Sequence, residues 1–140
     1  MYNRELLDHF SNPRHAGRLP DADALGVYGD PSCGDQMWLY LKIEGERIVR
    51  VGFEVFGCPA AVATASAFCE LVTGRTLDEG LEIGEGDVLD ALAGLPDEKI
   101  HCSLLAVMAY REAMTDYILG GSAAQAARAR AAAAEETTPK

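Results

Sequence analysis

The sequence has few of the features that would place a protein in a membrane or on a nucleic acid. It contains no apolar run close to the roughly 20 residues that span a bilayer, and no charged-then-apolar leader segment. Basic residues are scarce, since 12 of them stand against 22 acidic residues and give a net charge of −10. They form no cluster, so phosphate backbones and anionic lipids would be repelled. We therefore expect a cytoplasmic protein with no membrane or nucleic-acid partner.

Cysteine is also scarce. The 140 residues include four, which are Cys33, Cys58, Cys69 and Cys102. They lie far apart in a chain long enough to bury a core without disulfides. In a reducing compartment, cysteines of this kind more often bind metal or carry out chemistry than pair with one another.

The periodicity of apolar residues predicts strands followed by helices. Alternation over residues 36–43 and 48–56 predicts a β-hairpin, and a shorter strand near residues 25–28 could pair at its edge. A helical period follows, and we place helices at residues 3–10, 60–72, 77–81, 87–93 and 103–119. The absence of βαβ alternation indicates an α+β fold, with a three-stranded antiparallel sheet and helices packed on one face.

The composition divides the chain into one domain and a tail. Residues 1–120 carry the large apolar side chains and form the expected domain, whereas residues 121–140 are alanine-rich and contain no large apolar residue. This tail could be helical but has little with which to dock, so we expect it to be flexible. In the first helix, His9 has no cluster of donor residues near it, and we expect it on the helix surface.

Three of the cysteines share a local context at the ends of predicted elements: Cys33 in "GDPSCGDQM", Cys58 in "VFGCPAA" and Cys102 in "KIHCSLLA". Cys58 and Cys102 sit at helix N-termini, where free N–H groups and the helix dipole favour a thiolate. Beside the cysteines stand Asp35 and His101, one oxygen and one nitrogen donor. Three sulfurs with a fourth, harder ligand suit an iron–sulfur cluster or zinc, and we expect this site at one end of the sheet.

Two glycines beside the cysteines support this site, and a zinc finger and a cysteine hydrolase are the competing interpretations. Gly34 and Gly57 flank two of the cysteines and remove bulk where a large inorganic group would need the backbone close. Cys69 lies within a predicted helix and is expected in the core. A zinc finger would use short C-x-x-C-type pairs, which the chain lacks. A cysteine hydrolase would need His101 to face Cys102, but sequence neighbours entering a helix point about 100° apart.

Four motifs together carry a family resemblance. They are "NPRHAG", "GDPSCGDQM", "FGCPAAVATAS" and "KIHCSLLA". In this order and spacing they resemble the IscU/NifU family of iron–sulfur cluster assembly scaffolds, over residues 2–119. Each motif alone is modest, but the four in register, with all three cysteines, are highly specific.

The resemblance implies a non-enzymatic scaffold that receives persulfide sulfur from a cysteine desulfurase, takes up iron, forms a transient [2Fe–2S] cluster and passes it to apo-acceptor proteins. It implies that Cys33, Cys58 and Cys102 are ligands and sulfur acceptors, with Cys102 the primary persulfide acceptor. Asp35 and His101 match the family's two candidates for the fourth ligand. A ferredoxin or a frataxin-like protein is a further implied partner, and zinc could occupy the site in purified protein.

Three departures from the family refine this interpretation. Isc-type scaffolds carry Leu-Pro-Pro-Val-Lys for Hsp70 docking, whereas this chain has two acids within residues 95–99, which makes an Hsp70 partner doubtful. Nif-type scaffolds add domains with C-x-x-C pairs, and no such pair occurs here. Suf-type relatives, which are zinc-dependent sulfurtransferase partners of a desulfurase, have an insertion between the second and third cysteines and a lysine at the position of His101. Neither feature is present, so the Suf-type function ranks second to the scaffold function.

Overall fold

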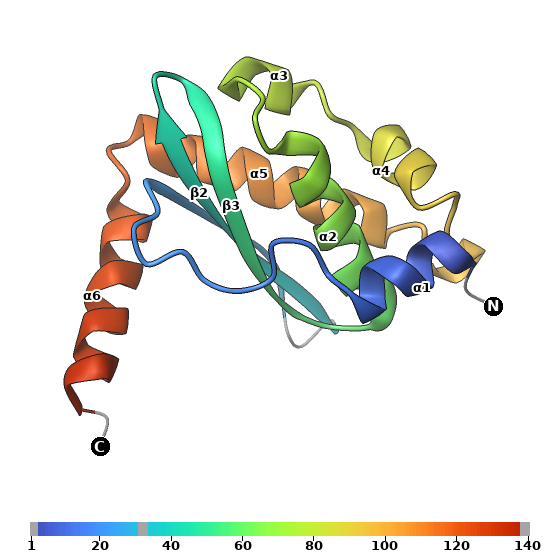
Figure 1. The fold of residues 1–140 in the computed structure, drawn as a ribbon, viewed down its shortest axis with the longest axis horizontal. Helices are drawn as coiled ribbons and strands as arrows, with labels where there is room; N and C mark the ends of the chain where they lie inside the picture. The colour runs from blue at the N-terminus through green and yellow to red at the C-terminus, as the bar shows by residue number, and fades with distance from the viewer. Residues whose placement is uncertain (1–2, 31–33, 138–140) are drawn as a thin grey trace.

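The fold is built on a three-stranded antiparallel sheet in the order β1–β2–β3. The computed structural model describes residues 3–30 and 34–137, and Figure 1 shows the arrangement. The strands are β1 (Ala24–Asp30), β2 (Asp35–Glu44) and β3 (Arg47–Phe56). The turn between β2 and β3 is formed by Gly45 and Glu46, both at positive φ, as a tight hairpin requires. The predicted hairpin and its third, edge strand are therefore confirmed.

Two long helices cover one face of the sheet. They are α2 (Pro59–Val72) and α5 (Cys102–Ile118). Among the strand residues of this core, Met37, Leu39 and Leu41 of β2 are fully buried. Gly26 of β1 lets α5 come close, because a Cβ there would overlap the α5 backbone at Ala109 and lie 3.0 Å from Ala113 Cα. This layer of helices on one sheet face confirms the predicted α+β architecture.

The shorter helices surround these layers. They are α1 (Arg4–Ser11), α3 (Leu77–Leu81), α4 (Glu85–Ala91) and the 3-10 helix η2 (Asp97–Lys99). Each of the α-helices lies within two residues of its predicted bounds. Within the described part of the chain, none of the helices combines the length and the apolar character needed to cross a bilayer.

His9 is buried against α2, so its predicted place on the helix surface is wrong. Only 7% of the residue is exposed, and its Nδ1 lies 2.8 Å from the Ser66 hydroxyl of α2. The backbone N–H of Arg14 donates to the same hydroxyl, also at 2.8 Å. Burial, followed by the nearby Arg14 charge, lowers the pKa of His9. The histidine therefore joins α1 and the following turn to α2 as a neutral, hydrogen-bonded side chain.

The alanine-rich segment forms a helix, α6 (Ser122–Thr137), whose first turns dock on the sheet. The sequence suggested little for it to contact, but Ala124 is 1% exposed and packs with Leu25 and Tyr40 on the face opposite α2 and α5. Arg128 Nε donates to the Ala22 carbonyl at 2.9 Å. Small side chains thus dock because they allow close approach to a surface that is already apolar. The helix then projects away from the sheet (Figure 1).

Asp116, near the end of α5, fastens α6 to β1. Its carboxylate accepts hydrogen bonds from the backbone N–H groups of Ala123 at 2.8 Å, Ala124 at 3.3 Å and Leu25 at 3.1 Å. The side chain is largely buried, so these bonds are shielded from water. One carboxylate therefore caps the start of α6 and pairs an otherwise free donor of β1.

We predict that Asp116→Ala lowers the free energy of unfolding by about 1–3 kcal/mol, because it leaves buried backbone donors without an acceptor. Urea denaturation gives this value, and amide hydrogen exchange at Ala123 and Ala124 should accelerate with it. The control is Glu112→Ala, at an exposed position of the same helix, with a change within about 0.5 kcal/mol. Equal stability of the two variants would contradict the role of Asp116.

Candidate functional site

The candidate site lies where β2 begins, β3 ends and α5 begins. Because β2 and β3 are antiparallel, with Gln36 opposite Phe56, the start of one strand and the end of the other share an edge of the sheet. Asp35 opens β2, and Cys58 follows β3 as the N-cap of α2. Cys102 is the first residue of α5. Three segments that are distant in sequence thus place one donor side chain each at the same end of the sheet.

The donor atoms of these residues lie close together. Cys102 Sγ is 3.9 Å from Cys58 Sγ and 3.8 Å from Asp35 Oδ2. One ligand atom from each of the three residues lies within 4.8 Å of the others. His101 Nε2 lies at their edge, 3.7 Å from Cys102 Sγ and 3.8 Å from Asp35 Oδ2, so the expectation that the His101 and Cys102 side chains point apart is wrong. Two sulfurs bound tetrahedrally to one zinc at the usual bond length lie about 3.8 Å apart, so the spacing suits one shared metal.

Asp35 is held by one of its two carboxylate oxygens. Oδ1 accepts a hydrogen bond from the backbone N–H of Cys58 at 3.0 Å, while Oδ2 is directed to Cys102 and His101. A Cβ on Gly57 would overlap Oδ1 and lie 3.0 Å from Cγ. Gly57 therefore makes room for the Asp35 carboxylate. It does not make room directly for an inorganic group. This anchoring is not visible in the sequence, because it depends on the register that places the start of β2 beside residue 57.

Three further residues discussed in the sequence analysis are Gly34, Cys33 and Cys69. Gly34 adopts φ 102°, which favours glycine, and a Cβ there would meet none of the described residues within 4 Å. Its requirement is thus conformational. Cys33 lies outside the described residues, so its predicted role as a ligand stays a prediction. Cys69 is fully buried in the hydrophobic core, and burial raises the pKa of its thiol. It packs as a small apolar side chain, as expected.

Burial opposes the thiolate form that the helix N-terminus favours at Cys102. Only 1% of Cys102 is exposed. Burial first, and then the charges of Cys58 and Asp35, raise the pKa of its thiol to about 12, against a smaller lowering by Lys99. The position at the start of α5 does not outweigh these effects. A cation bound among these groups would reverse the balance, because it stabilises the deprotonated sulfur.

The donor set determines what the site can hold. Two thiols, a carboxylate and an imidazole together suit iron or zinc, and not magnesium or calcium, which prefer oxygen ligands alone. Exposure increases across the set, from the buried Cys102 to the side chain of Asp35, 19% exposed, and that of His101, 68% exposed. A bound ion would therefore be held from beneath by sulfur and reached from solvent on the side of His101.

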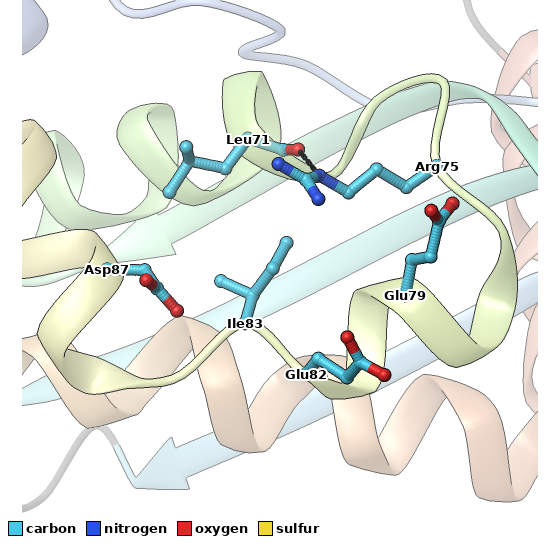
Figure 2. A pocket seen from close by; sticks show the side chains of 6 residues that line it. All are labelled: Leu71, Arg75, Glu79, Glu82, Ile83 and Asp87. Atoms are coloured by element: carbon cyan, nitrogen blue, oxygen red, sulfur yellow. Dashed lines mark hydrogen bonds between the residues drawn. The ribbon is translucent and has the colours of Figure 1, made fainter.

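A pocket of about 200 Å³ lies apart from this site, beside α2, α3 and α4. Figure 2 shows its lining, which is formed by Leu71, Arg75, Glu79, Glu82, Ile83 and Asp87. The Arg75 guanidinium donates to the Leu71 carbonyl at 2.7 Å. Glu79 and Asp87 accept from the N-cap backbones of α3 and α4. Both carboxylates thus cap the local helices, and none of the predicted site residues that the structure describes lines this pocket.

Comparison with protein families gives one match over most of the chain. Residues 1–125 match the family described as "NifU-like N terminal domain". The chain is 47% identical over 117 residues to "Iron-sulfur cluster assembly scaffold protein IscU 1" of Archaeoglobus fulgidus, which covers 84% of this chain and 76% of that protein. It is 39% identical over 120 residues to "Iron-sulfur cluster assembly scaffold protein IscU" of Escherichia coli, covering 83% and 93%.

Solved structures share the fold. The N-terminal part of a nitrogen-fixing NifU-like protein from Brucella abortus matches with a TM-score of 0.68 at 21% identity, covering 82% of this chain and 92% of that one. A protein from Fervidobacterium islandicum, described as a putative iron–sulfur cluster assembly scaffold for the SUF system, matches with a TM-score of 0.66 at 24% identity, covering 81% and 96%. At these identities the likeness shows the architecture alone.

We predict that Asp35→Asn accelerates alkylation of Cys102 in the metal-free protein. The amide keeps an oxygen for the Cys58 N–H but removes a negative charge, so the pKa of Cys102 falls and its thiolate fraction at pH 8 rises. Iodoacetamide labelling, resolved at Cys102 by mass spectrometry, measures the rate. Asp90→Asn, at an exposed position of α4, is the control. An unchanged rate for Asp35→Asn would show that the Asp35 charge does not contribute to the thiol's reactivity.

Proposed function

Because the chain belongs to the NifU-like N-terminal domain family, we propose that it is a scaffold on which iron–sulfur clusters are assembled before delivery to other proteins. The convergence of Asp35, Cys58 and Cys102 within 4.8 Å is the observation that carries this proposal. Relatives named as cluster assembly scaffolds, at 39–47% identity over more than four fifths of the chain, support it. The scaffold holds its cargo and releases it, so the cluster is a substrate of the protein.

The cargo in this proposal is a [2Fe–2S] cluster held by three cysteines and one exchangeable donor. Cys58 and Cys102 supply two of the sulfurs, and Cys33 supplies the third. Asp35 and His101, whose side chains are 3.8 Å apart, both reach the fourth position. Zinc would use the same donors, so zinc in purified protein is compatible with the scaffold function.

Sulfur enters through Cys102. Its thiolate attacks the terminal sulfur of a desulfurase persulfide, the partner's S–S bond breaks, the partner's thiolate leaves, and Cys102 becomes the persulfide. Because the pKa of Cys102 is raised to about 12, the thiol must first lose its proton. His101 Nε2, at 3.7 Å, is placed to accept it when the ring is neutral with its proton on Nδ1. Release of the sulfur as sulfide then takes two electrons, for which a ferredoxin-type donor is suited.

Transfer requires that the assembled cluster be held only loosely at one position. A carboxylate is a harder donor than a thiolate and binds iron of a sulfide-bridged cluster more weakly. Asp35 and the exposed His101 occupy the side from which an acceptor's thiol would approach. An acceptor thiol can therefore replace the weak ligand first and then draw the cluster away from the cysteines.

We predict that Cys58→Ala and Cys102→Ala abolish stable cluster formation, whereas Cys69→Ala leaves it intact because Cys69 lies in the core. Anaerobic reconstitution with iron and sulfide, followed by absorption and Mössbauer spectra, measures the cluster. Cys33→Ala tests the third predicted ligand in the same assay. A cluster that forms normally in Cys102→Ala would contradict the proposed function.

We predict that Asp35→Ala slows both spontaneous loss of the cluster and its transfer to an apo-acceptor, because His101 or another donor then completes coordination and the labile carboxylate is gone. Cluster lifetime and transfer rate are measured for both proteins under the same anaerobic conditions. Asp90→Ala serves as the matched control. Transfer that is as fast as in the unsubstituted protein would show that Asp35 is not the point of release.

A further inference from the structure

The start of α2 contains a contact that is specific for the Asp35 carboxylate. Oδ1 lies beside Gly57 and accepts a hydrogen bond from the Cys58 N–H at 3.0 Å. The other oxygen, Oδ2, is directed to Cys102 and His101, which together with Asp35 and Cys58 form the donor group. Cys58 is therefore connected to Asp35 by its backbone, while its sulfur faces Cys102. A residue that provides a ligand thus also holds a second ligand in place.

We propose that Gly57 is a positioning residue for the cargo site, through which Asp35 is held by Oδ1 so that Oδ2 is the oxygen presented to metal. This inference rests on the proposed function. It identifies the residue that fixes the position of Asp35, the exchangeable ligand of that proposal. Gly57 itself provides no donor atom. It acts by the absence of a side chain, since a Cβ would occupy the place of Oδ1 and come within 3.0 Å of Cγ.

This anchoring affects how the Asp35 carboxylate binds and releases metal. With Oδ1 bonded to the main chain, Asp35 binds metal through one oxygen, and it keeps its anchor when that bond breaks. The ligand is therefore in position before metal arrives and stays there after it leaves, so the cost of ordering it is small in both directions.

The substitution Gly57→Ala is suited to test this because it disturbs little else. Gly57 is not among the residues at positive φ, so alanine is compatible with the backbone. The Asp35 backbone is 3.3 Å from the added Cβ, a tight but tolerable contact, and the carboxylate can rotate away from it. That rotation breaks the bond to the Cys58 N–H and moves Oδ2 out of the donor group.

Cobalt(II) titration of the reduced, metal-free protein provides the measurement, because thiolate-to-cobalt absorption reports binding at the cysteines without any assembly partner. We expect Gly57→Ala to weaken the equilibrium binding of a single Co²⁺ ion by about 10- to 100-fold, as loss of an outer-shell contact typically does, even where the neutral His101 ring takes the place of the anionic carboxylate. Gly86→Ala is the matched control, since a Cβ there meets no described residue within 4 Å, and the Co²⁺ affinity of this variant should be unchanged.

A double-mutant cycle separates positioning from a general structural effect. In the Asp35→Ala background, Gly57→Ala should cause no further loss of Co²⁺ affinity, because the group on which it acts is gone. A further loss in that background, or an unchanged affinity for Gly57→Ala alone, would overturn the inference. If the unsubstituted chain fails to bind Co²⁺ through its cysteines, the proposed function fails as well, which is a different and recognisable result.

A second measurement avoids any risk that Gly57→Ala folds poorly. Amide hydrogen exchange of Cys58 in the unsubstituted protein should be slow both without and with Zn²⁺, and fast in Asp35→Ala. Loss of protection when Zn²⁺ binds would show that Oδ1 leaves the backbone for the metal, which overturns the proposal. Retained protection supports the one-oxygen binding of Asp35.

Discussion

The pairing of β2 with β3 is the constraint on which the site depends. The register sets Gln36 opposite Phe56, and so it places Asp35 beside the turn that carries Gly57 and Cys58. A shift by one residue would turn every side chain of β2 to the other face and remove Asp35 from the Cys58 N–H. The apolar alternation that buries Met37 and its neighbours resists such a shift. The core of the sheet and the geometry of the donor group are therefore determined by the same set of hydrogen bonds.

Periodicity alone was enough to predict the layers. The alternation in β2 and β3 and the helical spacing of α2 and α5 are local properties, so they can be seen without coordinates. The packing of α6 was missed because its alanines are small, and a small side chain docks only where a neighbour offers a fitting surface. His9 was misplaced for a related reason, since its partner Ser66 lies in a distant helix.

The candidate site, like the fold, is predictable from the sequence only in part. The sequence suggested Asp35, Cys58, His101 and Cys102 from their chemistry and their place at the ends of elements, and the structure brings all four together. It could not indicate how Asp35 is held, because that depends on a backbone N–H and a missing Cβ. Nor could it indicate that burial outweighs the helix terminus at Cys102. Local composition therefore gives the donors, and three-dimensional packing gives the orientation of Asp35 and the raised pKa of Cys102.

The placement of α6 has a practical consequence for handling the protein. Cys102 begins α5 and Asp116 lies near its other end, so the whole length of that helix separates the donor group from the point where α6 is attached. Figure 1 shows α6 projecting from the far end of α5, away from the start of that helix. A purification tag or a fluorescent reporter joined after α6 would therefore be held at a distance from proteins that bind at the start of α5.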